Sequence, residues 1–80
     1  MMSERDVVTF AQIEQILMIL DERGISREMI EIPLGTRDPG AIKTLPGGRI
    51  RVVVPSSGDF DEWVETSAPG ILSALGWTEG

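Results

Sequence analysis

The chain has 80 residues and a formal net charge of −6 at pH 7, and 41% of its residues are hydrophobic. This length predicts a single small domain, residues 1–80, close to the lower limit for a self-sufficient core. The sequence has no cysteine, which excludes a disulfide framework and a thiolate metal site. Because an acidic chain is repelled by phosphate backbones, direct nucleic-acid binding is not expected.

The first predicted element is a helix whose start and end both carry capping signals. Thr9 and Gln12 have the spacing of a capping box. Gly24 suits the left-handed residue that commonly closes a helix. Residues 1–8, which precede the helix, are expected to form a flexible N-terminal arm.

This helix is amphipathic in its first half and apolar nearly all round in its second half. An apolar stripe at helical spacing is formed by Phe10, Ile13, Ile16, Leu17 and Leu20. Met18 and Ile19 fall outside that stripe. Two interpretations follow: the rest of the chain wraps around the helix, or Met18 and Ile19 form the interface of a homodimer.

The middle of the chain, residues 27–55, predicts a small antiparallel sheet. Its clearest part is a β-hairpin around the Pro-Gly-Gly sequence at 46–48, where glycine supplies the positive φ of a tight reversal. With this three-residue loop, Thr44 lies opposite Ile50. Residues 29–34 also alternate and predict a third strand, placed at an edge because its proline cannot donate to a ladder.

Side-chain alternation separates an apolar face of this hairpin from a basic face. The apolar face holds Ile42, Ile50, Val52 and Val54. The other face holds Lys43, Arg49 and Arg51, and Arg27 or Arg37 could extend it. We predict this basic face as one candidate partner-binding surface.

The last third of the chain predicts one or two short helices. Residues 36–40 have the composition of a turn. Asp59 and Glu62 have the spacing of a second capping box, so a helix is expected over residues 60–66. The Ser-Ala-Pro sequence at 67–69 predicts the start of another helix, which ends at Gly76.

The same segment carries the second charged surface, because residues 55–80 contain five carboxylates and no basic residue. We predict partner binding by Asp59, Asp61, Glu62 and Glu65. Their spacing suits the start of a calcium loop, but no downstream glycine and bidentate glutamate complete such a loop. Helix capping accounts for the same residues, so neither a metal site nor a cofactor is predicted.

Catalysis is not expected either. The sequence has no histidine, cysteine or tyrosine, and so lacks most side chains that act as acids, bases and nucleophiles. Its apolar runs are too short to span a bilayer, and its first residues lack the pattern of a signal peptide. A cytoplasmic location is therefore expected.

The predicted fold class is α+β: an N-terminal helix, an antiparallel hairpin extended to three strands, and one or two short C-terminal helices. The predicted function is a non-enzymatic protein-binding module. In size and acidity the chain resembles small phage-encoded inhibitors of host defence, anti-CRISPR proteins among them, and antitoxin-like antagonists. The resemblance implies an inhibitor of a nucleic-acid-handling complex, whose acidic surface mimics nucleic acid in a cationic groove.

Other functions remain open. The apolar N-terminal helix would suit a small structural or regulatory subunit that dimerises or docks on a larger enzyme. Residues 24–30 superficially match the turn of a helix-turn-helix, with the hairpin as a wing, which would suit a winged-helix-like DNA-binding regulator. A minor enzyme or small-ligand domain is the third alternative.

Overall fold

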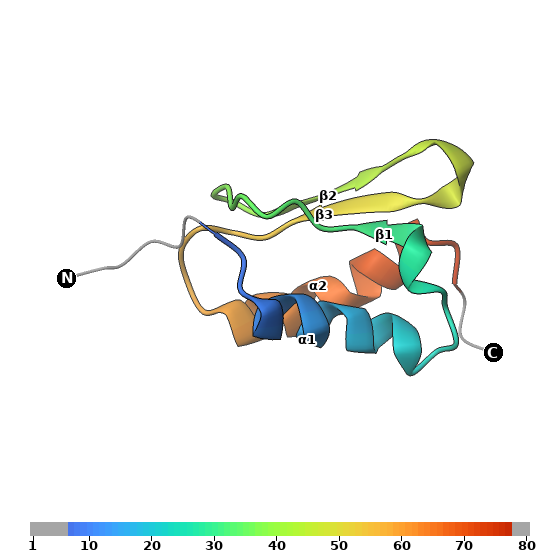
Figure 1. The fold of residues 1–80 in the computed structure, drawn as a ribbon, viewed down its shortest axis with the longest axis horizontal. Coiled ribbons are helices and arrows are strands. Elements are labelled where there is room, and N and C mark those ends of the chain that lie inside the picture. The colour runs from blue at the N-terminus through green and yellow to red at the C-terminus, as the bar shows by residue number, and fades with distance from the viewer. Residues whose placement is uncertain (1–6, 78–80) are drawn as a thin grey trace.

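The computed structural model describes residues 7–77, which form two layers. A small sheet makes one layer, and two helices lying side by side make the other (Figure 1). The helices and strands are α1 (Phe10–Asp21), β1 (Ile30–Glu31), β2 (Ala41–Thr44), β3 (Ile50–Val53) and α2 (Phe60–Ala74). Two 3₁₀ turns, η1 (Arg27–Met29) and η2 (Pro46–Gly48), precede β1 and β3. The predicted α+β class is confirmed.

The predicted capping of α1 is confirmed at its N-terminus. The Thr9 hydroxyl accepts a hydrogen bond from the Gln12 N–H at 3.2 Å, and the Gln12 side chain accepts one from the Thr9 N–H at 3.0 Å. These two bonds satisfy backbone donors that have no partner within the helix. Just before the helix, the Val8 N–H donates to the Leu34 carbonyl at 2.8 Å. Of the predicted arm, residues 1–6 lie outside the described residues.

The hairpin forms in the predicted register, with Thr44 opposite Ile50 and Lys43 opposite Arg51. Gly47 and Gly48 have φ angles of 81° and 79°, a region that side chains with a Cβ rarely adopt. Local turn chemistry therefore decided the pairing, as expected from the sequence.

The third strand differs from the prediction in direction and length. β3 is the central strand, and β1 pairs with it in parallel, so the sheet is mixed rather than antiparallel. β1 contains only Ile30 and Glu31. Pro33 lacks an N–H group and cannot continue the ladder. Beyond it, Leu34 is 63% exposed and takes no part in the core.

α2 is one continuous helix, so the predicted break at residue 67 is wrong. Pro69 lies inside it, although an interior proline removes one helical hydrogen bond and costs about 3 kcal/mol. Val64 and Ile71, on either side of this proline, are both buried in the core. Their burial offsets the local penalty, because tertiary packing routinely overrides helix propensity.

The core lies between the sheet and the helices, but α2 rather than α1 makes the more extensive contacts with the hairpin. The hairpin therefore packs mainly on the second helix. The side chains with the least exposure are Ile16, Leu20, Ile50, Ile71, Val52 and Val54. Phe10 is 75% exposed, because a residue six positions before Ile16 lies about 120° away around a helix.

Gly40, in the turn before β2, is required by close approach of two chain segments. A Cβ at this position would lie 2.7 Å from both the Pro55 side chain and the Val53 carbonyl oxygen. The sequence predicted glycine here for turn conformation. The structure assigns it a steric role that brings the turn against the end of β3.

Candidate functional site

The four predicted acidic residues lie on the first turns of α2, and we call them the acidic surface: Asp59, Asp61, Glu62 and Glu65. All four are exposed. The Asp59 carboxylate caps the helix by accepting from the N–H groups of Asp61 at 3.0 Å and Glu62 at 3.3 Å. Asp61 also accepts a hydrogen bond from the Gln15 amide of α1 at 3.1 Å. The Asp59 cap thus fixes this surface at the start of α2, and the Gln15 hydrogen bond links it to α1.

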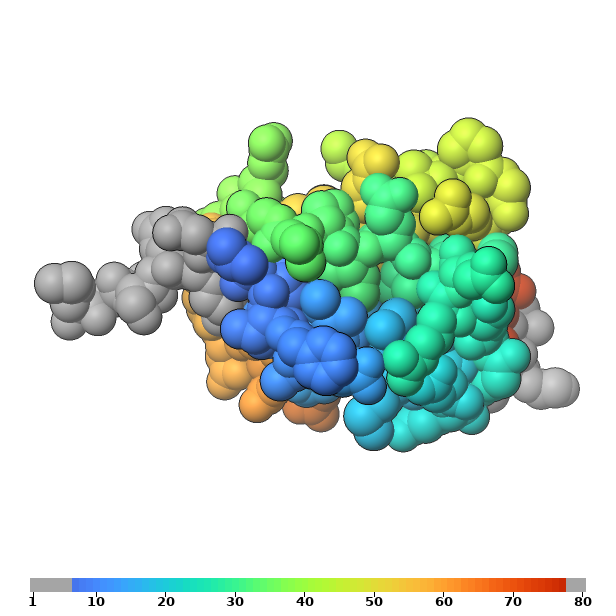
Figure 2. Space-filling view, viewed as in Figure 1, coloured from blue at the N-terminus to red at the C-terminus, as the bar shows by residue number. Residues whose placement is uncertain are grey.

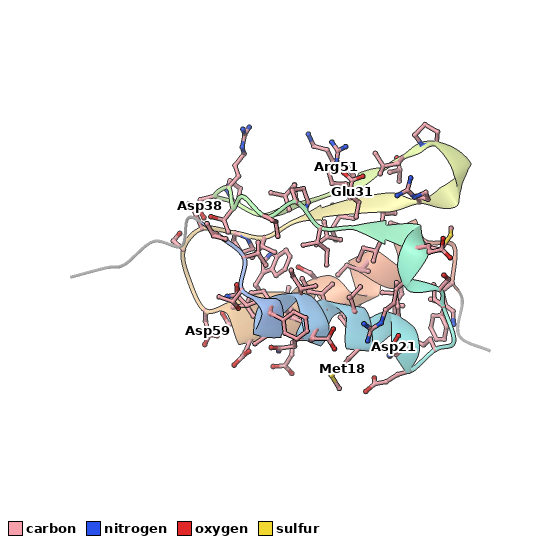
Figure 3. The ribbon with its side chains drawn as sticks, in the orientation of Figure 1. Met18, Asp21, Glu31, Asp38, Arg51 and Asp59 are labelled. Carbon is pink, nitrogen blue, oxygen red and sulfur yellow. The ribbon has the colours of Figure 1, made fainter. Side chains whose placement is uncertain are left out.

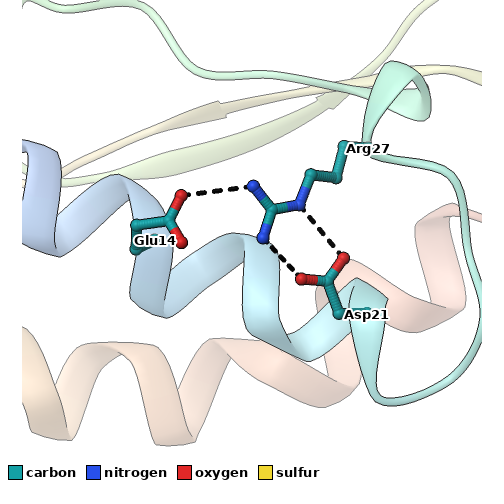
Figure 4. A network of polar contacts seen from close by, with 3 residues as sticks. All are labelled: Glu14, Asp21 and Arg27. Carbon is teal, nitrogen blue, oxygen red and sulfur yellow. Dashed lines mark hydrogen bonds and ion pairs between the residues drawn. The ribbon is translucent and has the colours of Figure 1, made fainter.

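The carboxylates on and beside α1 are neutralised within the chain. The Arg27 guanidinium donates to both oxygens of Asp21 and, at 3.2 Å, to Glu14 (Figure 4). Glu22 pairs with Arg23 at 3.2 Å. By contrast, the acidic surface forms no ion pair with any residue between 7 and 77. The two helices therefore differ in the charge that they present to a partner.

The ion pair at Arg27 changes the pKa of both groups. Hydrogen bonds from Arg27 lower the pKa of the Asp21 carboxyl below its usual value. Hydrogen bonds to Asp21 and Glu14 raise the pKa of Arg27, so its guanidinium stays charged at physiological pH.

The fold adds a carboxylate that the sequence did not connect with the acidic surface. Asp38 from the turn before β2 lies at the same end of the molecule as Asp59 (Figure 3). Together with Glu62, they border a cavity of about 340 Å³ whose wall also includes Trp63. The sequence places Asp38 in the predicted turn at residues 36–40, but only the fold shows that this turn faces α2.

We call this space the acidic cavity, and its chemistry suits an organic cation. Carboxylates and an aromatic ring together bind guanidinium and ammonium groups by charge and by cation–π attraction. Within residues 7–77, no three acidic side chains are grouped closely enough to hold a metal ion. A lysine or arginine side chain of a partner fits this arrangement.

Glu65 borders a different cavity, with Arg23 and Trp77. The Arg23 guanidinium carbon lies 5.5 Å from the Trp77 ring centroid, and its Nη1 donates to the Ile19 carbonyl at 3.3 Å. Arg23 is thus held at the end of α1 and forms no ion pair with Glu65. The acidic surface extends along α2 from the acidic cavity to this second depression.

Arg51 lies on the sheet face that points away from the helices (Figure 3), and the register and alternation of the hairpin put Lys43 and Arg49 on the same face. Arg51 pairs with Glu31 of β1 at 2.8 Å, and Arg49 donates to the Glu28 carbonyl at 3.2 Å. Lys43 lies directly opposite Arg51. Arg27 does not extend this face, since its guanidinium is bound to Glu14 and Asp21 of α1.

The two residues predicted for a dimer interface have different environments. Ile19 is half-buried and packs against the core, whereas Met18 is 52% exposed and points away from the sheet (Figure 3). Phe10 and Met18 are the large hydrophobic side chains that α1 exposes.

No protein-family model, curated protein or solved structure gives a significant match to this chain. No helix in the described part of the chain has the length and hydrophobicity needed to cross a bilayer.

Proposed function

We propose that this protein is a small non-enzymatic binding module that docks on a cationic surface of another protein through the acidic surface and the acidic cavity. The observation that carries the proposal is the contrast in ion pairing between the two helices. Arginine neutralises Glu14, Asp21 and Glu22, while the acidic surface has no cationic partner among the described residues.

Uncompensated charge of this kind suits recognition. Exposed charges of one sign steer a complementary partner and speed its association. The acidic cavity adds a specific contact, because its carboxylates and Trp63 can enclose one partner arginine or lysine. A groove that normally binds nucleic acid supplies both features, a cationic track and projecting basic side chains. Inhibition of a nucleic-acid-handling complex is therefore the form of the function that we propose.

The winged-helix alternative has less support. Residues 27–29 form a single 3₁₀ turn that leads directly into β1, so a recognition helix does not follow α1 there. The exposed surface of α2 is acidic, and a phosphate backbone would be repelled by it.

The proposal is tested by measuring binding kinetics after a partner has been isolated from source cells by cross-linking. Asp61→Asn with Glu65→Gln should slow association about tenfold at low ionic strength and reduce its salt dependence. The matched control is Glu14→Gln with Glu22→Gln, which removes two paired carboxylates on and beside α1 and should change association less than about twofold. Denaturant midpoints measured in parallel separate a loss of binding from a loss of folding.

The opposite result would place the working surface elsewhere. If the Asp61/Glu65 double variant binds as well as the wild type while Arg49→Ala or Arg51→Ala abolishes binding, the basic sheet face is responsible. The proposal would then be wrong.

A further inference from the structure

The outer face of the sheet contains a groove that the proposed docking surface does not use. The chain from Pro33 to Pro39 forms one wall of the groove, and outward side chains of β2 and β3 form its floor. Its volume is about 370 Å³, within the range of small-ligand sites. In the space-filling view, side chains project from the sheet side of the molecule with hollows between them (Figure 2).

Three cations border this groove: Arg37, Lys43 and Arg51. Arg51 is paired through its Nε with Glu31 at 2.8 Å. Neither Arg37 nor Lys43 forms an ion pair within residues 7–77. Among the described residues, Arg37 and Lys43 are therefore two cations at the groove that no ion pair compensates.

The register of the sheet brings two of these positive charges close together. Lys43 and Arg51 lie directly opposite each other on adjacent strands, and like charges in that position repel. An anion bound between them would remove the repulsion and satisfy the terminal donors of both side chains. Repulsion of this kind favours a ligand over an empty groove.

We infer that this groove binds a small organic phosphate monoester. A phosphate monoester carries about −1.5 to −2 charges at pH 7, which matches the two uncompensated cations. Arginine and lysine are the side chains that most often bind phosphate oxygens. Pro33, Pro39 and Val53 line the same groove and provide an apolar surface for the organic part of the ligand.

The test is an NMR titration of the whole ¹⁵N-labelled chain with three probes: phenyl phosphate, phenyl sulfate and inorganic phosphate. Phenyl phosphate should give saturable shifts at residues around the groove. Phenyl sulfate has the same ring but one charge, and inorganic phosphate has the charge but no ring, so both should bind about fivefold to tenfold more weakly. No saturation by phenyl phosphate up to its solubility limit would overturn the inference.

Variants distinguish the groove from the general charge of the sheet face. Lys43→Gln and Arg37→Gln should each weaken phenyl phosphate binding about tenfold, the loss of one charge-assisted contact. Arg49→Gln is the matched control, because Arg49 lies on the same face but does not line the groove. If Arg49→Gln weakens binding as much as Lys43→Gln, binding is non-specific. If phenyl sulfate binds as tightly as phenyl phosphate, the groove does not require a dianion. If inorganic phosphate binds as tightly as phenyl phosphate, the groove does not recognise the organic part of a monoester.

Discussion

The two helices lie side by side under one sheet (Figure 1), yet arginine pairs with the carboxylates of α1, whereas those of α2 form no ion pair within residues 7–77. The two helices themselves contain similar numbers of acidic residues, and neither contains a basic one. The difference comes from Arg27, which η1 places over α1, where it reaches Glu14 and Asp21. Net charge therefore describes this protein less well than the location of the charges that remain after pairing.

The largest expected effect is on stability. It tests whether both helices contribute equally to the core although their surface charges differ. Leu20 of α1 and Ile71 of α2 are both fully buried. Leu20→Ala and Ile71→Ala should each lower the free energy of unfolding by about 2–5 kcal/mol, since each leaves a cavity. Chemical denaturation measures both values.

Leu34→Ala is the control for these core variants, because Leu34 is 63% exposed. Its free energy of unfolding should stay within about 0.5 kcal/mol of the wild-type value. If only one of the two core variants is destabilised, the helices do not share one core, and the contrast between them extends beyond surface charge.

A smaller effect should follow from making α1 resemble α2. Arg27→Gln removes the cation that neutralises Glu14 and Asp21 and leaves two unpaired carboxylates on α1. The Tm should fall at low ionic strength, and the fall should shrink at about 1 M salt because surface charges are then screened. Lys43→Gln is the control: it removes a cation that lies opposite Arg51, so its Tm should not fall.

The same variant predicts a dependence on pH. Arg27 lowers the pKa of Asp21 in the folded protein, so the unfolded chain binds a proton more readily than the folded one as the solution becomes acidic. The stabilisation is complete above the unfolded pKa of about 3.9 and is lost as the pH falls through the lower folded value. The difference in Tm between wild type and Arg27→Gln should therefore be constant near neutral pH and disappear in acid. A difference that persists at low pH would show that Arg27 acts through packing.

Features decided by neighbouring residues were predictable from the sequence. The hairpin register follows from the glycines at 47 and 48, and the start of α1 follows from Thr9 and Gln12. Both depend on hydrogen bonds or backbone angles within a few residues. The acidic and basic residue sets were identified for the same reason, since composition and alternation are local properties.

Features decided by distant residues were not predictable. The parallel pairing of β1 with β3 joins segments with no common local signal, and α2 continues through Pro69 because residues on both sides are buried by the sheet. The pairing of Arg27 with Glu14 and Asp21 depends on how η1 is oriented against α1. The position of Asp38 depends likewise on how the turn before β2 is oriented against α2. Sequence patterns identified which groups are charged, whereas the fold determined which of them are paired.

The mixed pairing of β3 has a consequence for the order in which the sheet assembles. Its pairing with β2 closes a loop of three residues, Pro46–Gly48, whereas its pairing with β1 joins Ile30 to Ile50 across twenty positions. Short loops close with a smaller entropy loss and form hairpins within microseconds. We therefore expect one side of β3 to become ordered before the other.

Backbone amides on β3 report on the two sides separately. The Leu45 N–H donates to the Arg49 carbonyl, and antiparallel alternation then directs the N–H of Arg51 toward β2 and that of Val52 toward β1. In quenched-flow hydrogen exchange, the Arg51 amide should be protected first; simultaneous protection would mean that the whole sheet forms in one step. The two edges of β3 would thus become protected at two different stages of folding.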